Sequence, residues 1–168
     1  MRELVLVTGG VRSGKSRKAL EIAADAPRTF VATAAALDGE MAARIAEHRR
    51  SRASDFATVE EPVELARALR ERPDGDLVAD CMTLWLSNLM EAGAGREEIG
   101  ARVRDVIDAA KGRRGRTVLV TNEVGWGVVP VSELGRRFRD ESGSMSQALA
   151  AAADRVLLVV AGLELRLK

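Results

Sequence analysis

A glycine-rich loop near the N-terminus constrains this chain more than any other stretch of its sequence. An apolar run at residues 4–7 is followed closely by the pattern G-x-x-x-x-G-K-S, spelled Gly9-Gly10-Val11-Arg12-Ser13-Gly14-Lys15-Ser16. Between a buried strand and a helix, such a loop wraps the phosphates of a nucleotide, because its glycines let several backbone N–H groups point at one anion. The sequence therefore predicts a nucleotide phosphate site at residues 9–16.

Three sources of positive potential are expected at this loop. Lys15 supplies a point charge for the β- and γ-phosphates, and the helix that begins near Gly14 directs the positive end of its dipole at the same anion. The Ser16 hydroxyl is placed to ligate Mg²⁺. We therefore expect a Mg²⁺-nucleotide complex to bind here.

Apolar, β-prone runs alternate with helical patterns along the chain. Strands are predicted at residues 4–8, 29–33, 77–81, 117–121 and 155–160, with an extended segment at 163–167. Helices are predicted at residues 62–72, 96–111 and 132–153, the last with a weak break at 142–144, and a basic cluster at 112–116 is interpreted as an exposed turn. This alternation predicts an α/β protein with a mostly parallel sheet and helices on both faces.

Length and composition indicate one ordinary domain that acts on small molecules. The 168 residues fit a single compact core, residues 1–168, with no room for a separate substrate domain. The net charge is +1 and basic residues are interspersed with acidic ones, so composition gives no reason to expect a nucleic-acid surface.

The sequence favours a cytoplasmic location. The single cysteine, Cys81, excludes an internal disulfide and a Cys-rich zinc site, which suits a reducing compartment, and we interpret it as a packing residue. The N-terminus enters the first strand without a signal-peptide pattern, and no apolar stretch reaches the ~20 residues of a membrane span.

The lone histidine, His48, lies near the apolar stripe of a helix predicted for residues 38–52. One interpretation is a core or rim histidine that is satisfied by a hydrogen bond. Arg49, Arg50 and Arg52 follow it, and they are either a solvated helix face or, together with the imidazole, part of a phosphate-handling site. Spacing alone leaves both interpretations open.

Two acidic residues follow predicted strands. Asp80 ends an apolar strand. There it holds Mg²⁺ through water or contacts the nucleotide, or else it caps the helix that begins at Met82. Glu123 lies in the loop at residues 122–130, where it orients a metal or a substrate hydroxyl or is a surface acid. Trp126 in the same loop is either a site residue or an interface anchor.

Six blocks in a fixed order resemble one known family. They are T-G-G-x-R-S-G-K-S at 8–16, A-T at 32–33, E-M-A-A-R-I-x-x-H at 40–48, T-L-W-L-S-N-L at 83–89, T-N-E-V-G-W-G-x-V-P at 121–130 and A-A-A-A-D at 150–154. Together they resemble the bifunctional adenosylcobinamide kinase / adenosylcobinamide-phosphate guanylyltransferases of cobalamin synthesis, over almost the whole chain. The resemblance implies a three-layer, RecA-like P-loop fold, a homotrimer, and ATP, GTP and adenosylcobinamide as substrates.

The resemblance also implies roles for individual residues. His48 stands where the family's guanylylated histidine does, and Lys15 acts in the phosphate loop. Ser16 and Asp80 are the implied Mg²⁺ ligands. The implied nucleotide contacts are residues 9–16, Thr33, Ala34, Ala35, Arg49, Arg50, Ser51, Arg52, Glu60 and Asp80.

The expected function is a pair of reactions. The first phosphorylates adenosylcobinamide with ATP or GTP, and the second transfers GMP from GTP, through His48, to adenosylcobinamide phosphate, which gives adenosylcobinamide-GDP and pyrophosphate. One alternative is a P-loop kinase of another small alcohol in which His48 is structural. Another is a nucleotide-binding regulatory module without turnover.

Overall fold

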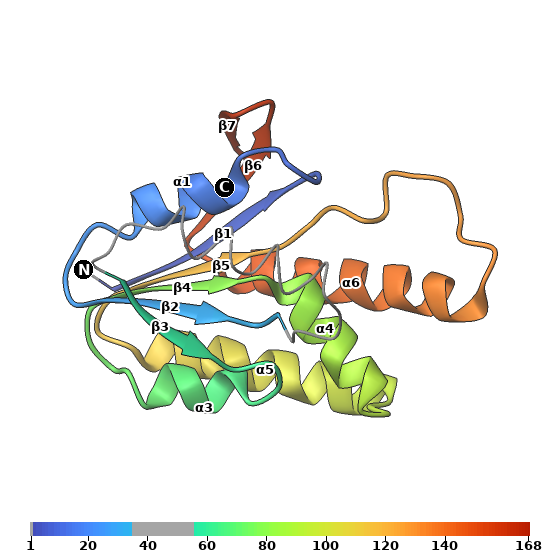
Figure 1. The fold of residues 1–168 in the computed structure, drawn as a ribbon, viewed down its shortest axis with the longest axis horizontal. Helices are drawn as coiled ribbons and strands as arrows, with labels where there is room; N and C mark the ends of the chain where they lie inside the picture. Colours follow the sequence, from blue (N-terminus) through green and yellow to red (C-terminus); the bar gives the residue numbers. More distant parts are fainter. Residues whose placement is uncertain (1, 35–55) are drawn as a thin grey trace.

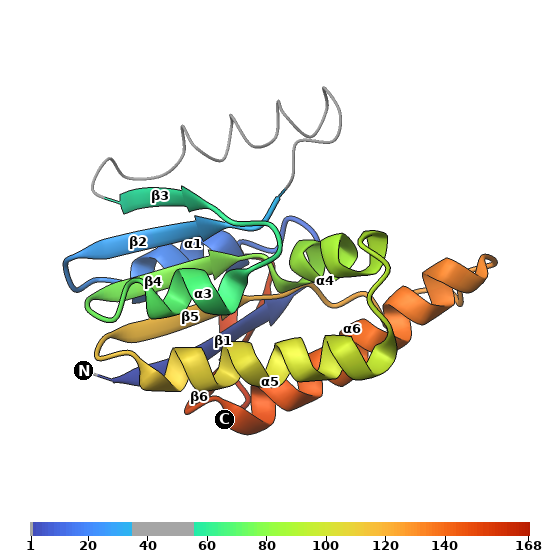
Figure 2. The same cartoon turned by 90° about the horizontal axis from the view of Figure 1, so that it is seen from below.

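The computed structural model describes residues 2–34 and 56–168, which form a seven-stranded sheet flanked by helices (Figures 1 and 2). The strand order is β3-β2-β4-β5-β1-β6-β7, and every neighbouring pair is parallel except β6 and β7. In chain order the elements are β1 (Glu3–Gly9), α1 (Lys15–Ile22), β2 (Arg28–Ala32), β3 (Phe56–Glu60), α3 (Leu65–Arg70), β4 (Asp76–Asp80), α4 (Met82–Glu91), α5 (Arg96–Gly112), β5 (Arg116–Val120), α6 (Glu133–Ala152), β6 (Arg155–Val160) and β7 (Leu163–Arg166).

Strand β1 lies inside the sheet, with β5 on one side and β6 on the other. Its side chains alternate between the two faces, because successive residues of a strand point in opposite directions. Val5 and Val7 pack in one core cluster, and Leu4 and Leu6 pack in the other. A strand that is buried on both faces explains why residues 4–7 are continuously apolar.

Helices cover both faces of this sheet, so the predicted three-layer α/β architecture is confirmed for the described residues. In Figure 1, α1 lies on one side of the sheet and α3, α5 and α6 lie on the other. Ala19 and Ala23 pack at α1 on the first face, whereas Leu69, Val106 and Leu149 belong to the cluster on the second. These small and aliphatic side chains form the core expected of a chain with few aromatic residues.

Two elements differ from the sequence prediction. Strand β3 was not predicted, because it is an edge strand whose side chains are partly or fully exposed and therefore lack a continuous apolar pattern. Helix α6 runs without a break through residues 142–144. Met145 and Leu149 are buried against the core in this helix, and that packing overrides the weak helical propensity of Gly143.

The interpretation of residues 112–116 as an exposed basic turn is wrong for Arg113, whose side chain is almost fully buried. Its guanidinium donates five hydrogen bonds, to the carbonyl oxygens of Arg72 (2.7 Å), Asp74 (3.2 Å), Gly75 (2.8 Å) and Arg116 (3.1 Å) and to the hydroxyl of Thr117 (2.8 Å). Burial lowers the pKa of Arg113 to about 10, against the opposing effect of Asp76 and Asp74. The side chain therefore stays charged at neutral pH and ties the turn before β4 to β5.

Candidate nucleotide site

The predicted phosphate loop connects β1 to α1 at the carboxyl edge of the sheet. Gly14 has a φ of 98°, a left-handed value that favours glycine, and it occupies the N-cap position of α1. A Cβ atom on Gly9 would overlap the carbonyl oxygen of Val159 in β6. Both glycines of the pattern are therefore explained by the backbone around them.

The turn between β6 and β7 supports the phosphate loop. The N–H of Gly162 donates a 2.8 Å hydrogen bond to the carbonyl oxygen of Ser13. A Cβ on Gly14 would lie 3.3 Å from the Cα of Gly162, so the loop and the turn are in close contact. Residues near the two ends of the described chain thus meet at this loop.

Lys15 lies folded over the loop. Its side chain is buried, and its Nζ donates a 2.9 Å hydrogen bond to the carbonyl oxygen of Gly10. Burial lowers the pKa of Lys15, while the nearby Asp80 and Cys81 act to raise it. A carboxylate beside the ammonium favours its charged form. The structure thus brings Asp80 to the lysine of the phosphate loop.

Asp80 is the last residue of β4, which β5 separates from β1. The N-cap of α4 is Cys81, without a side-chain capping hydrogen bond, so the interpretation of Asp80 as the helix cap is wrong. Cys81 itself is buried, and burial raises the pKa of its thiol, as expected for a packing residue rather than a nucleophile. The other interpretation, in which Asp80 holds Mg²⁺ through water or contacts the nucleotide, stays a prediction.

Thr33 joins the carboxyl ends of β2 and β4. Its hydroxyl donates a 2.7 Å hydrogen bond to the carbonyl oxygen of Cys81, and its own carbonyl oxygen accepts 2.8 Å from the side-chain amide of Asn88. The N–H of Thr33 donates to the carbonyl oxygen of Asp80 at 3.2 Å. These bonds fix the backbone at Thr33 and Ala34, both predicted to contact the nucleotide, and Asn88 is a supporting residue that the sequence analysis did not single out.

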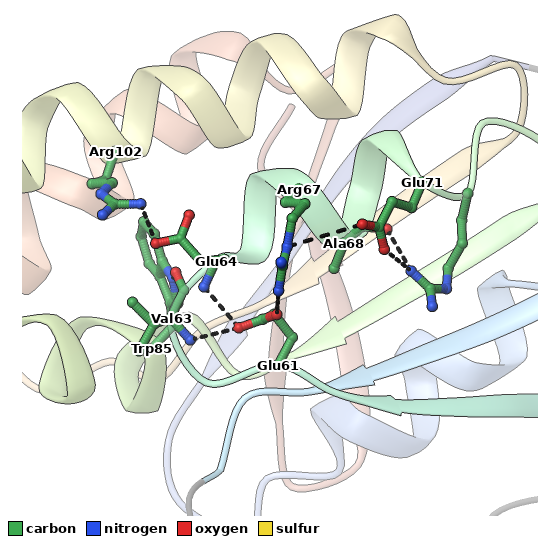
Figure 3. A network of polar contacts seen from close by, with 9 residues as sticks. Glu61, Val63, Glu64, Arg67, Ala68, Glu71, Trp85 and Arg102 are labelled. Carbon is green, nitrogen blue, oxygen red and sulfur yellow. Dashed lines mark hydrogen bonds and ion pairs between the residues drawn. The ribbon is translucent and has the colours of Figure 1, made fainter.

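Glu60 ends β3 at the same edge, and a polar network fixes the segment that follows it (Figure 3). Glu61 accepts hydrogen bonds from the N–H groups of Val63 (3.2 Å) and Glu64 (2.8 Å) and from the guanidinium of Arg67 (2.9 Å). Burial acts to raise the pKa of Glu61, but the N–H of Glu64, Arg67 and the N–H of Val63 lower it, and the lowering prevails. Glu61 is therefore ionised, and its carboxylate fixes the backbone at the start of α3 through these hydrogen bonds.

Glu123 is attached to the phosphate loop from the other side. Its N–H donates a 3.1 Å hydrogen bond to the carbonyl oxygen of Gly9, and one oxygen of its carboxylate accepts 2.5 Å from the hydroxyl of Thr8. Glu123 is thus a half-buried residue beside the phosphate loop, and its role in orienting a metal or a substrate hydroxyl stays a prediction. Trp126 and Val128, by contrast, are exposed on the loop between β5 and α6.

Several predicted site residues lie outside the described residues. They are Ala35, His48, Arg49, Arg50, Ser51 and Arg52, together with the helix predicted for residues 38–52. The predicted residues that the structure does place at the carboxyl edge are the loop 9–16, Thr33, Ala34, Glu60 and Asp80. In the two described parts of the chain, we find no helix long and apolar enough to cross a membrane.

Comparison with known sequences decides the family. The family model described as cobinamide kinase / cobinamide phosphate guanyltransferase matches residues 5–167. The chain belongs to this family. The resemblance seen in the six sequence blocks is therefore confirmed, and the protein is an enzyme of cobalamin biosynthesis with kinase and guanylyltransferase activities.

Two curated relatives are similar over their full lengths. The bifunctional adenosylcobalamin biosynthesis protein CobP of Pseudomonas aeruginosa is 45% identical over 172 residues, which cover 100% of this chain and 98% of the relative. The bifunctional adenosylcobalamin biosynthesis protein CobU of Escherichia coli is 39% identical over 180 residues, which cover 98% and 99%. These matches favour the bifunctional enzyme over a kinase of another small alcohol and over a module without turnover.

Solved structures with little sequence identity share the fold. The flagellar accessory protein FlaH of Methanocaldococcus jannaschii has a TM-score of 0.54 at 11% identity, covering 99% of this chain and 78% of that one. A solved ATPase domain has a TM-score of 0.52 at 16% identity, covering 94% of this chain and 69% of that one. The RecA-like P-loop fold expected from the sequence is thereby confirmed.

Proposed function

We propose that the carboxyl edge of the sheet forms one nucleotide site that serves two successive transfers. In the first, the hydroxyl of the aminopropanol arm of adenosylcobinamide takes the γ-phosphoryl group of ATP or GTP. In the second, GMP passes from GTP to His48 and then to adenosylcobinamide phosphate, giving adenosylcobinamide-GDP and releasing pyrophosphate. The observation that carries the proposal is the loop at residues 9–16, where the charge of Asp80 acts on Lys15, in a chain of this family.

The loop offers the phosphates several donors. The hydroxyl of Ser13 is buried and has no hydrogen-bond partner among the described residues, and a phosphate oxygen would supply one. The N-terminus of α1 adds backbone N–H groups and a favourable dipole. On binding, the Lys15 ammonium exchanges the carbonyl oxygen of Gly10 for phosphate oxygens, which replaces a neutral acceptor by a charged one.

The second transfer is assigned to His48 from the family's sequence block. A neutral imidazole nitrogen attacks the α-phosphorus of GTP, a nitrogen–phosphorus bond forms, and the bond to the pyrophosphate leaving group breaks. Arg49, Arg50, Ser51 and Arg52 are proposed to contact the nucleotide beside it. Covalent catalysis of this kind replaces one transfer between two anions by two displacements.

Mg²⁺ is the proposed cofactor, and the residues at the edge fit it. The Ser16 hydroxyl in the first turn of α1 and the Asp80 carboxylate are oxygen ligands of the kind that Mg²⁺ prefers. The described parts of the chain contain no group of three or more His, Cys, Asp or Glu residues that could hold a metal ion. Phosphate oxygens and water would therefore complete the coordination, and the bound ion would neutralise phosphate charge.

An exposed apolar loop supports the proposed homotrimer. It comprises the exposed residues Trp126, Val128, Val129, Val131 and Leu134, on the connection from β5 to α6 and its first turn. A second copy of this chain, as the family resemblance implies, would cover this surface. We further propose that residues 1–168 are one domain, since every described strand joins one sheet, and that the enzyme works in the cytoplasm.

Labelling with α-³²P-GTP tests the division of roles. The wild-type protein should acquire acid-labile label, and His48→Ala should lose the label while it keeps the kinase step. Lys15→Ala should lower both partial reactions by on the order of 10²-fold. Lys18→Ala, which removes a lysine of α1 that pairs with Glu21 of α1 and Glu164 of β7, should lower neither. An active kinase that never becomes labelled would contradict the role of His48.

A further inference from the structure

A cavity of about 380 Å³ adjoins the phosphate loop and is not used by the nucleotide site described above. It lies between the carboxyl ends of β1 and β5, the loop that follows β5, and α6, which Figure 1 shows returning beneath the sheet. Its polar lining includes Thr8, Asn122, Glu123, Arg139, Ser146 and Gln147. Leu6 and Val156 also line it, which places it on the face of the sheet opposite α1.

The cavity and the phosphate loop share a wall. Thr8 immediately precedes the loop, and Glu123 is bonded to the loop through the carbonyl oxygen of Gly9. A group bound in the cavity would therefore lie beside the loop, on the face of the sheet opposite α1. An acceptor of a phosphoryl group has to reach the nucleotide that such a loop holds, and this cavity is next to it.

A hydrogen bond positions the carboxylate of Glu123 through only one of its two oxygens. One oxygen accepts the hydrogen bond of Thr8, and the other makes no hydrogen bond with any residue that the structure describes. The two bonds that Glu123 makes with residues 8 and 9 fix its side chain and backbone on the loop. A fixed carboxylate with one free oxygen at the wall of a cavity is suited to accept a proton.

We propose that this cavity binds the hydroxyl-bearing arm of the cobinamide substrate and that Glu123 is the general base of the kinase step; this rests on the proposed function. The alcohol oxygen attacks the γ-phosphorus of ATP, its proton passes to the carboxylate of Glu123, and the bond between the γ-phosphorus and the bridging oxygen breaks to release ADP. The proton then leaves to water.

The size and lining of the cavity fit this assignment. Drug-sized ligands occupy pockets of about 300–1,000 Å³, so 380 Å³ accommodates an aminopropanol amide but not the corrin ring, which remains outside. Asn122, Ser146 and Gln147 offer amide and hydroxyl groups that match the amide of the arm. Arg139 adds a positive charge that favours the phosphorylated product.

Glu123→Gln tests the base directly, because the amide keeps an acceptor for Thr8 but takes up no proton. The kcat of cobinamide phosphorylation should fall by about 10²–10⁴-fold, with KM for adenosylcobinamide changed by less than about threefold. Glu133→Gln, at an exposed acid on α6, is the matched control and should behave as wild type. Label transfer from α-³²P-GTP to the protein, which needs no acceptor alcohol, should persist in Glu123→Gln.

Thr8→Val separates catalysis from structure. It removes the hydrogen bond that Glu123→Gln keeps, but it leaves the carboxylate, so kcat should fall by less than tenfold. A loss in Thr8→Val as large as that in Glu123→Gln would show that the position of this side chain, and not proton transfer to it, carries the effect. Ser146→Phe fills the cavity and should raise KM for adenosylcobinamide at least tenfold without changing KM for ATP. A wild-type protein without cobinamide kinase activity would contradict the proposed function, whereas an active Glu123→Gln would contradict only this inference.

Discussion

The buried guanidinium of Arg113 offers a sharp test of how the sheet is held together. Replacing Arg113 by Met keeps most of the side-chain volume but removes five hydrogen-bond donors from the turn before β4 and from β5. The four carbonyl oxygens and one hydroxyl that accept these bonds lose a shared partner. The wild-type protein avoids this cost because its buried cation is satisfied by all five acceptors.

The magnitude follows from the geometry. At about 1.5–3 kcal/mol for each hydrogen bond from a charged group, five bonds would sum to about 7–15 kcal/mol. Burying the guanidinium offsets several kcal/mol of this sum, and removing one partner from a buried charged arrangement costs about 3–5 kcal/mol. We expect Arg113→Met to lower the free energy of unfolding by that amount, which lowers Tm by about 6–20 °C for a chain of this size.

Urea unfolding at pH 7, followed by the fluorescence of the buried Trp85, measures the change. Arg114→Met is the matched control, since the neighbouring side chain is 72% exposed and pairs with Asp74, itself 55% exposed, across 2.6 Å. Exposed pairs contribute about 0–1 kcal/mol. If the two variants unfold within about 1 kcal/mol of each other, the stabilising role assigned to Arg113 is wrong.

Three further outcomes follow from other contacts. The pKa of Glu61 is lowered in the folded state, so its contribution to stability is complete above the unfolded pKa of 4.5 and is lost as pH falls through the lower, folded one. Glu61→Gln should therefore reduce the loss of stability that thermal melts show as pH falls below 4.5. Gly75→Ala should destabilise by at least about 1–3 kcal/mol, since Gly75 has a φ of +73° and a Cβ there would overlap the carbonyl oxygen of Pro27, and urea midpoints would show it. Val131→Asp, at a side chain that is 97% exposed, should leave the monomer's stability unchanged but lower the mass found by sedimentation; an unchanged mass would contradict the proposed subunit contact.

The sheet and the phosphate loop are predictable from the sequence because local patterns encode them. Residues 4–7 are apolar on both faces, and the glycines at 9 and 14 meet backbone constraints that the pattern anticipates. Strand β3 escaped prediction because an edge strand has one neighbour and no buried face to impose an apolar run. Its place in the sheet depends on pairing with β2, which a local pattern does not show.

Polar residues are harder to assign, since their partners are distant in sequence. Arg113 sits in a run that suggests a solvated turn, and only the approach of residues 72–75 turns it into a buried donor. Asp80 and Glu123 each had two interpretations at the sequence level. The structure excludes Asp80 as the cap of α4 and shows that Glu123 is bonded to Thr8, but the roles of both residues at the site remain predictions. The assignment of His48 depends on the family's sequence block and remains a prediction.

The contact between the phosphate loop and the β6–β7 turn bears on how this protein is made. The loop leaves the ribosome well before Gly162, which bonds to Ser13, and before Val159, which lies against Gly9. Both edges of strand β1 can be paired only after β5 and β6, which are synthesised later, have emerged. A nascent chain that ends before β6 should therefore bind no nucleotide, so ATP and GTP select chains in which β6 and the turn after it have formed.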